Sequence, residues 1–492
     1  KPLNGCFIVL KKINSNSIYI MTINYTAHKN LSELNLIPFF ERDKPISFQG
    51  VSLNETLFSG KKDTTFLMEQ EGKILLLIGL GKSPDYKAIQ TIFRRISAKQ
   101  NNLFQQQATL FLPSEMVEIQ VQAAISGLWL GTYQLGHYQQ NNKVHALLSA
   151  DFSLEIVSDI DFENAVNRGL KIGQAQLETY NLVDLPPNKI TPDFLAQWAK
   201  ATGEKYGFEV TVFGREKAIE LGLHAFTAVG KGSINEPQFI IMDYNPTHAK
   251  SHFGLVGKGI TFDTGGLNIK TAGMVHMKCD MAGGAAVLGA MQLIADLKLP
   301  YRVTAIVPAC ENSVDAHSFL PSDVIGSYAG KSIEIIDTDA EGRLILADGL
   351  SYLIKNYNPK TIIDLATLTG SSVATFGNVC GALFSKNESL AKQLQKAGDQ
   401  IGERLWPLPL WDAYQSDIES EIAEVKNYSG KPVAGAISAA KFLEYFTEEH
   451  PTWAHLDIAG VTFVDDEFAK TKHATAFGVH LITTFIENQT YE

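Results

Sequence analysis

The stretch IDTDAEGRL, residues 336–344, places two acids and a cation on one short segment directly before a helical pattern. The apolar side chains that follow recur with a period of about 3.6 residues, and they are Leu344, Leu346, Ala347, Leu350, Leu353 and Ile354. Asp339 therefore lies near a predicted helix N-terminus and Glu341 in the first turn, where acids are favoured. Taken alone, the stretch is equally typical of a capped helix whose charges are solvated.

A second segment, residues 257–280, also carries acids and lysines within an apolar, glycine-rich sequence. The charged residues that matter here are Lys258, Asp263, Lys270 and Asp280. Lys258 follows a predicted strand at 253–256, and Asp280 precedes a predicted helix at 282–297. The two segments together place four carboxylates at the ends of strands and helices of one predicted domain.

Convergence of these four carboxylates would predict a metal site. Mutual repulsion would raise their pKa values unless cations lie among them, and two divalent ions would balance four negative charges. A lysine beside such a cluster loses its proton readily and can bind a metal as a neutral amine. Oxygen-rich sites suit Mg²⁺ and Mn²⁺, and Zn²⁺ also accepts carboxylates, whereas the sequence contains no HExxH zinc motif. Each acid alone is more often a helix cap or a surface charge, so only the combination favours a metal site.

Strands and helices alternate along most of the chain, which predicts an α/β fold. We expect a smaller N-terminal α/β domain at residues 1–160, a connecting helix at 161–183 and a larger C-terminal α/β domain at 184–492. The PPN break at 186–188 ends the connecting helix. The larger domain should contain a mixed, mostly parallel sheet covered by helices.

Ligands collect at the carboxyl ends of the strands in sheets of this kind. Lys258, Glu311 and Thr367 each fall just past the end of a predicted strand, so we expect them near a ligand. In the N-terminal domain the pattern predicts a helix at 117–138 and a strand at 144–148.

Composition narrows the classes of function. The chain has 492 residues, of which 45% are hydrophobic and 19% charged, as in an ordinary globular protein with a large core. A formal net charge of −11 and the lack of any Lys/Arg run argue against a nucleic-acid partner. Runs of apolar residues and glycine, such as 74–81, are too short to span a bilayer, and the four cysteines show no disulfide framework. We therefore expect a cytoplasmic protein with no signal peptide and no membrane partner.

Four blocks of the sequence, taken in order, resemble the leucyl aminopeptidase family. They are VGKGITFD at 256–263, DTDAEGRL at 337–344, DLATLTG at 364–370 and WAHLDIAG at 453–460. The resemblance covers essentially all of residues 180–490, whereas the first 160 residues match only loosely. It implies that residues 184–492 form the catalytic domain of a dinuclear metallopeptidase.

The resemblance also implies a role for each site residue. Two divalent ions, Mn²⁺ or Zn²⁺ with Mg²⁺ possible, would be held by Lys258, Asp263, Asp280, Asp339 and Glu341. Lys258, Asp263 and Asp280 would bind one ion, Asp339 and Glu341 the second, and Asp263 and Glu341 would bridge them. Lys270 and Arg343 would be the catalytic pair, with a bicarbonate on Arg343. The residues in contact with the substrate would be Met277, Thr367, Leu368 and Ala459, with Thr462 nearby.

The expected activity is the release of N-terminal residues from peptides. A water that bridges two metal ions becomes hydroxide near neutral pH and can attack the peptide bond. The pocket implied by Met277 and Ala459 predicts a preference for Leu-like or Met-like residues. By resemblance we expect a homohexamer.

Two alternatives stay open, namely a dinuclear metallophosphatase with the same carboxylates and an aminopeptidase with an added DNA-binding regulatory role. The chain also departs from the family pattern at two places. Asp337 stands where the signature usually begins with Asn, and the segment from Lys270 to Asp280 is one residue shorter than is common in the family, which could shift Lys270.

Overall fold

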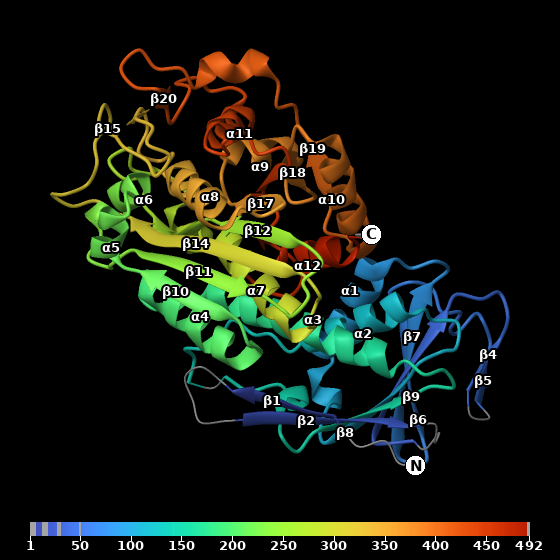
Figure 1. Cartoon of the computed structure of the whole chain (residues 1–492). Coiled ribbons are helices and arrows are strands. Elements are labelled where there is room, and N and C mark those ends of the chain that lie inside the picture. Colours follow the sequence, from blue (N-terminus) through green and yellow to red (C-terminus); the bar gives the residue numbers. More distant parts are fainter. Residues whose placement is uncertain (1–5, 12–17, 27–30, 49–50, 141, 490–492) are drawn as a thin grey trace. The chain divides into compact units, whose positions relative to one another are not determined.

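The computed structural model describes residues 6–11, 18–26, 31–48, 51–140 and 142–489, and Figure 1 shows its ribbon. The chain divides into two units, Lys1–Leu177 and Glu178–Glu492. Both units combine helices with a mixed sheet, so the predicted α/β class is confirmed. The scheme of two domains joined by a helix at 161–183 stays a prediction.

The first unit contains a seven-stranded sheet in which parallel pairs lie between antiparallel edges. In spatial order its strands are β1 (Cys6–Lys11), β2 (Ile18–Thr26), β9 (Ser153–Val157), β8 (Gln107–Phe111), β3 (Leu34–Phe40), β7 (Lys73–Gly81) and β6 (Thr65–Gln70). A separate short hairpin consists of β4 (Ile46–Phe48) and β5 (Val51–Leu53). The helices that begin in this unit are α1 (Tyr86–Lys99), α2 (Glu118–Leu130) and α3 (Glu163–Asp184).

Two local predictions in the first unit are wrong. The expected strand at 144–148 is a 3₁₀ turn over Ala146–Leu148, because the His145 ring accepts a hydrogen bond from the Leu147 amide, 3.1 Å away, and closes a local cap. The expected helix at 117–138 ends at Leu130. There Gly131 lies so close to α1 that a Cβ would stand 2.5 Å from the Arg94 carbonyl oxygen.

The second unit contains a nine-stranded mixed sheet. In spatial order its path is β10 (Glu209–Phe213), β11 (Gln238–Tyr244), β14 (Arg302–Asn312), β12 (His252–Gly257), β17 (Thr361–Ala366), β21 (Trp453–Asp457), β18 (Gly381–Phe384) and β19 (Leu405–Pro407), with β13 (Gly259–Asp263) paired to β14. The central pairs β14/β12, β12/β17 and β17/β21 are all parallel. The sheet is therefore mostly parallel at the central strands, which lead into the predicted site residues.

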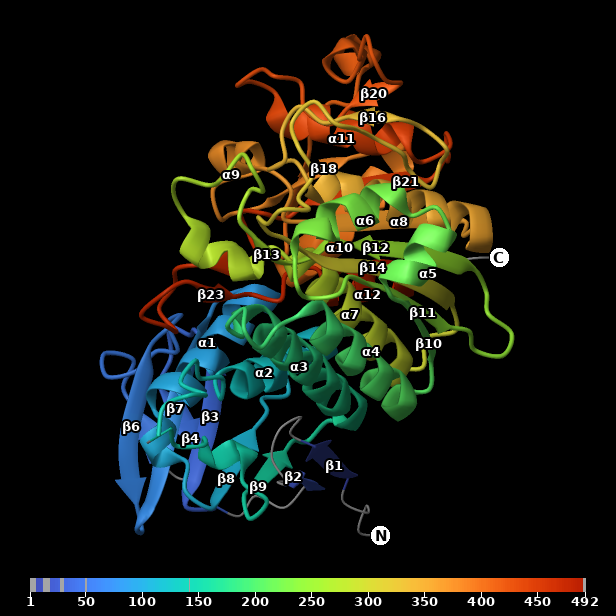
Figure 2. The same ribbon diagram turned by 90° about the vertical axis from the view of Figure 1, so that its left-hand side faces the viewer.

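Helices cover both faces of this sheet, as Figures 1 and 2 show. On one face α8 (Gly342–Tyr357) packs with α6 (His224–Val229) and α11 (Gly435–Tyr445). On the other, α7 (Ala282–Asp296) packs with α4 (Pro192–Tyr206) and α12 (Val479–Glu487). The remaining helices are α5 (Arg215–Glu220), α9 (Gly370–Phe376) and α10 (Glu388–Ile401). Within the described residues, none of the helices combines the length and apolar character that crossing a membrane requires.

Glycines bring α7 unusually close to the sheet. A Cβ on Gly283 would lie 2.2 Å from the Leu365 carbonyl oxygen, and one on Gly257 would lie 2.7 Å from the Gly283 carbonyl oxygen. Larger residues at these positions would push the helix away from β12 and β17. The glycines thus carry the start of α7, and the segment just before it, to the carboxyl ends of the central strands.

A buried carboxylate, Asp348, connects α8 to neighbouring segments. Its two oxygens accept hydrogen bonds from the amides of Phe226 at 2.9 Å and Tyr328 at 2.7 Å, and the residue is fully buried. Burial raises the pKa of Asp348 to about 7, although the backbone donors oppose this rise. The ionised side chain is therefore held in the folded protein at a cost in free energy.

We expect Asp348 to make the metal-free protein less stable as pH rises. Because its folded-state pKa of about 7 exceeds the unfolded value of about 3.9, the free energy of unfolding should fall between these two pH values and level off above. The contribution is on the order of a few kcal/mol. Urea titrations from pH 4 to pH 8 should show the fall in wild type relative to Asp348→Asn. The exposed variant Glu388→Gln should follow wild type, and a pH-independent difference for Asp348→Asn would contradict the assignment.

Candidate metal centre

The predicted site residues gather where the central strands end and two helices begin. Lys258 directly follows β12, and Asp263 ends β13. Asp280 lies just before α7, and Glu341 lies just before α8. The site therefore lies at the carboxyl edge of the parallel strands, where ligands bind in sheets of this kind.

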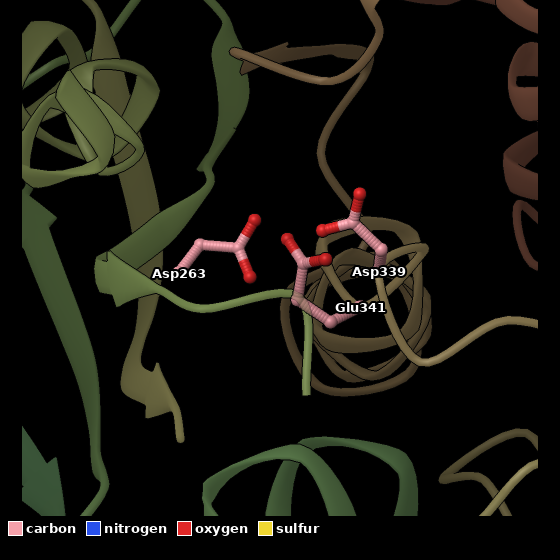
Figure 3. A group of neighbouring side chains, drawn as sticks. All are labelled: Asp263, Asp339 and Glu341. Atoms are coloured by element: carbon pink, nitrogen blue, oxygen red, sulfur yellow. The ribbon is translucent and has the colours of Figure 1, made fainter. Parts of the chain in front are cut away.

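Three carboxylates converge there. Oxygens of Asp263, Asp339 and Glu341 all lie within 4.8 Å of one another, and Figure 3 shows the three side chains pointing toward one another. Asp263 and Glu341 are buried and Asp339 is partly buried. Burial, together with the charges of Asp263 and Glu341, raises the pKa of Asp339 to about 7. Burial and the charge of Asp263 also raise the pKa of Glu341.

Lys258 lies among the acids on one side of this cluster. Its ammonium nitrogen is 2.8 Å from Asp280 Oδ1, 2.9 Å from Glu341 Oε1 and 3.0 Å from the carbonyl oxygen of Thr367. Burial alone would lower the pKa of Lys258, but the neighbouring acids outweigh it and raise the pKa above its ordinary value. Without a metal ion, this lysine is a cation that neutralises part of the cluster.

Lys270 lies against the other side of the cluster. Its nitrogen is 2.8 Å from Asp263 Oδ2 and 2.5 Å from Asp339 Oδ1. Burial lowers the pKa of Lys270, but the two acids together raise it by more, so the net shift is upward. The short segment after Lys270 therefore does not turn its side chain away from the acids.

The alternative interpretation of the acids as helix caps is wrong for two of them. Glu341 is the N-cap residue of α8, but its side chain makes no capping hydrogen bond. Asp280 is not the N-cap of α7, which is Met281, and its Oδ1 instead accepts a hydrogen bond from the Thr367 hydroxyl at 2.8 Å. Both carboxylates thus remain directed toward the lysine rather than toward a helix end.

The buried acceptors of this site fit divalent cations. Among the described residues, Asp280 Oδ2 and Glu341 Oε2 are buried and have no hydrogen-bond partner. Buried acceptors without partners are rare because they lose their hydration without compensation. A set of carboxylate oxygens with one amine is a donor set that Mn²⁺ and Zn²⁺ accept.

Arg343 occupies the first turn of α8 and is buried. Its Nη1 donates a hydrogen bond to the carbonyl oxygen of Asn427 at 2.8 Å, while its Nε has no partner among the described residues. Burial lowers the pKa of Arg343 to about 10, against the opposing charges of Glu341 and Asp337. The guanidinium therefore stays charged at neutral pH with donor capacity to spare.

One asparagine and one aspartate hold this site together through hydrogen bonds. Neither was predicted from the sequence. Asn312 at the end of β14 donates to Asp263 Oδ1 at 2.8 Å and to the Thr338 carbonyl oxygen at 3.0 Å. Asp457 at the end of β21 accepts from the Leu368 amide at 3.2 Å. No local sequence pattern marks either residue for this role.

Asp457 organises the segment that the resemblance assigns to the substrate. Besides the Leu368 amide, it accepts hydrogen bonds from the Thr369 hydroxyl at 2.6 Å and the Ala459 amide at 3.2 Å. Because Lys258 binds the Thr367 carbonyl, the peptide between Thr367 and Leu368 is held from both sides. Met277 lies on the 3₁₀ turn Met274–Cys279 and, like Leu368 and Ala459, is half-buried.

The expectation for Glu311 is wrong. Its carboxylate accepts hydrogen bonds from Ser233 and from Asn235, the latter at 2.8 Å. Strand β14 continues to Asn312, and adjacent strand residues point to opposite faces. Asn312 therefore faces Asp263, and Glu311 does not. Asp337 stands where the family signature usually begins with Asn. Its side chain accepts a hydrogen bond from the Asp339 backbone amide at 2.8 Å and so closes a local turn.

Comparison with known proteins identifies the family. Residues 178–483 match the cytosol aminopeptidase family, catalytic domain. A probable cytosol aminopeptidase of Chloroherpeton thalassium is 39% identical over 468 residues, which make up 89% of this chain and 92% of the relative. The chain belongs to the cytosol aminopeptidase family. It is therefore a peptide hydrolase, as the sequence resemblance implied.

Other relatives of this aminopeptidase agree. A probable cytosol aminopeptidase of Roseiflexus castenholzii is 39% identical over 450 residues, which make up 88% of this chain and 91% of that protein. Among solved structures, the bottromycin maturation enzyme BotP in complex with Mn is similar with a TM-score of 0.82 and 27% identity, covering 92% of this chain and 99% of that one. The likeness to BotP thus extends over most of both chains.

We expect Gly342→Ala to damage both the site and the stability of the aminopeptidase. A Cβ at this position would lie 2.5 Å from Lys258 Cε and 2.7 Å from its Nζ, so the lysine would have to leave Asp280 and Glu341. Overpacking of this kind costs about 1–3 kcal/mol, and displacing a group that supports a metal site lowers activity about 10–100-fold. Thermal unfolding and peptide hydrolysis measure the two effects. Gly370→Ala is the stability control, because nothing lies within 4 Å of its added Cβ, and equal unfolding temperatures for both variants would contradict the prediction.

Proposed function

We propose that this aminopeptidase releases N-terminal residues from peptides with two divalent ions bound at the carboxylate cluster. The observation that carries the proposal is the convergence of Asp263, Asp339 and Glu341 within 4.8 Å. Solvated surface acids would have no reason to bury two of these three carboxylates beside one another.

The contacts support a division of the ligands into two sets. Lys258, Asp263 and Asp280 would hold one ion, and Asp339 and Glu341 the second. By the family resemblance, Asp263 and Glu341 would be shared by both ions, and the convergence of their oxygens with that of Asp339 supports this assignment. We propose Mn²⁺ or Zn²⁺, with Mg²⁺ as a further candidate, and the similarity to BotP, whose structure was solved in complex with Mn, favours Mn²⁺. Lys258 would bind as a neutral amine and release its proton when the ion enters.

Two such ions, when bound, would supply the Lewis-acid chemistry that activates water for attack on the peptide carbonyl near neutral pH. The Lys270 ammonium is positioned to stabilise the negative charge that develops on the carbonyl oxygen. Arg343 would hold a bicarbonate through its remaining donors, and that anion would carry the proton toward the leaving amine. The Leu368 carbonyl would accept a hydrogen bond from the free α-amino group of the substrate.

The substrate would be a peptide with a free, apolar N-terminal residue. Met277, Thr367 and Ala459 would line the pocket for its side chain, and the Thr367 hydroxyl donates to the Asp280 carboxylate, which leaves the methyl group as its apolar part. We expect faster hydrolysis of Leu and Met anilides than of Asp or Gly anilides. N-acetylation should abolish hydrolysis, because it removes the free amine. Equal rates on acetylated and free peptides would exclude the exopeptidase mechanism.

Removal of the divalent ions provides the direct test of the metal requirement. Dialysis against a chelator should abolish hydrolysis of a leucyl anilide, and Mn²⁺ or Zn²⁺ should restore it with two ions bound per chain. Circular dichroism before and after dialysis controls for unfolding. Full activity in a sample shown to contain no metal would end the dinuclear proposal while leaving the family assignment intact.

By resemblance we further propose that the enzyme acts as a cytoplasmic homohexamer. Analytical ultracentrifugation tests the hexamer, and a monomeric species at micromolar concentration would exclude it. The formal net charge of −11 supports the view that nucleic acid is not a partner.

A further inference from the structure

Asn427 is a fully buried residue that sequence analysis did not single out. It follows β20 (Val425–Lys426), which pairs in parallel with β16 (Ile333–Glu334). Its backbone amide donates a hydrogen bond to the Glu334 carbonyl oxygen at 3.0 Å. The short sheet therefore places Asn427 beside the loop 336–340, which carries Asp339.

The side chain of Asn427 binds both ends of that loop. Its Oδ1 accepts hydrogen bonds from the amides of Ile336 at 2.8 Å and Asp337 at 3.3 Å. Its Nδ2 donates to the carbonyl oxygens of Asp337 at 2.6 Å and Ala340 at 3.4 Å. One side chain thus supplies hydrogen-bond partners to the loop backbone, as a neighbouring strand would otherwise do.

The main chain of Asn427 supports the second functional element. Its carbonyl oxygen accepts the hydrogen bond from Arg343 Nη1 at 2.8 Å. Asp339 lies just before the start of α8 and Arg343 just after it. Asn427, which lies far later in the chain, contacts Arg343 and the loop that carries Asp339.

Only asparagine satisfies this arrangement. Aspartate has the same shape, but it cannot donate to the two carbonyl oxygens when ionised, and it would add a buried negative charge beside Asp337. Alanine would leave the amides of Ile336 and Asp337 and the carbonyl oxygen of Ala340 without the partner that Asn427 supplies, which is destabilising, whereas the Asp337 carbonyl oxygen would keep the Ala340 amide at 3.3 Å.

We propose that Asn427 is a positioning residue that holds Asp339 against Asp263 and Glu341 and supports Arg343, without touching the substrate itself. The loop is anchored at Asp337 and Ala340, which lie two residues before and one residue after Asp339. If the anchors are lost, Thr338 keeps its hydrogen bonds to Asn312 and Asn268, but the Asp339 carboxylate is held less firmly in the cluster, while Lys258, Asp263 and Asp280 keep their own contacts. The consequence for metal binding rests on the proposed function, whereas the anchoring of the loop does not.

Hydrogen–deuterium exchange in the metal-free protein tests the anchoring. In wild type the Ile336 and Asp337 amides should exchange slowly, because Asn427 Oδ1 accepts from both. In Asn427→Ala their exchange should be faster by about tenfold or more, whereas the carboxylate of Asn427→Asp can still accept from both amides and should leave their exchange slow. Ser420→Ala is the matched control, since the Ser420 hydroxyl binds the Glu334 carboxylate at 2.5 Å in the same region but makes no hydrogen bond to the loop. In Ser420→Ala the Ile336 and Asp337 amides should exchange as in wild type.

Calorimetric titration with Mn²⁺ tests the consequence. Wild type and Ser420→Ala should bind two ions, whereas the Asn427 variants should bind one ion as before and the second about 10–100-fold more weakly. Fast exchange of Ile336 in wild type, or wild-type exchange and binding in Asn427→Ala, would overturn the inference. If neither variant folds, the wild-type exchange rates alone decide. Failure of wild type to bind two ions would instead overturn the proposed metal site and leave the exchange result standing.

Discussion

The Asp263→Asn variant is expected to lose bound divalent ions and peptidase activity together. Asp263 Oδ1 accepts hydrogen bonds from Asn312 at 2.8 Å and from the Gly265 amide at 2.9 Å, whereas Oδ2 faces Lys270. Asparagine can keep the two accepted hydrogen bonds through its own oxygen, so the fold should persist. Its amide nitrogen would then replace the oxygen that faces the cluster, and a protonated amide nitrogen does not bind a metal ion.

The effect should exceed that of losing one contact to the transition state, which typically lowers kcat about 10²–10³-fold, because both ions depend on a bridging ligand. Metal content after gel filtration and hydrolysis of a leucyl anilide measure the two quantities. Glu388→Gln makes the same change of charge at an exposed position on α10 and should behave as wild type. Two bound ions and full activity in Asp263→Asn would exclude Asp263 as a bridging ligand.

The Lys270→Ala variant should lose activity while it keeps its metal ions. Lys270 binds no metal ion in the proposed arrangement. Its ammonium instead stabilises the negative charge that develops on the carbonyl oxygen of the substrate. We expect kcat to fall about 10²–10³-fold with a much smaller change in KM. The affinity for Mn²⁺ should be unchanged or higher, because the ammonium that lies against Asp263 and Asp339 also repels a cation.

Lys217→Ala is the control for Lys270→Ala, since among the described residues the Lys217 side chain forms an exposed ion pair with Glu220 alone. Steady-state kinetics and Mn²⁺ titration on both variants separate catalysis from binding. An unchanged kcat in Lys270→Ala would remove this lysine from the mechanism but not the chain from its family. A parallel loss of Mn²⁺ would show instead that Lys270 organises the ligands.

Elements with strong local signals could be predicted from the sequence. Helix α4 carries such signals, because Thr191 caps it, Pro192 occupies its first turn, and Gly207 ends it in the left-handed conformation. The apolar period after residue 341 likewise predicted α8. These signals act over a few residues and need no tertiary partner.

Elements without such signals were misassigned or missed. Strands β3 and β6 were not anticipated, and the strand expected at 144–148 is a turn. In this part of the chain, short apolar runs occur in strands and in turns alike. Which of them joins the sheet depends on partners distant in the sequence, such as β7, which lies between β3 and β6.

The sequence by itself determined the class of the fold, the family and the identity of the acids and lysines, because each is written in residue types and their local spacing. Only the tertiary structure decided that Asp263, Asp339 and Glu341 meet, that Lys270 reaches them, and that Glu311 points elsewhere. It also decided the roles of Asn312, Asn427 and Asp457. Their hydrogen bonds join segments that the chain separates by tens of residues. An isolated amide or carboxylate carries no periodicity that could announce its partners, so its role emerges only when strands and helices bring those partners together.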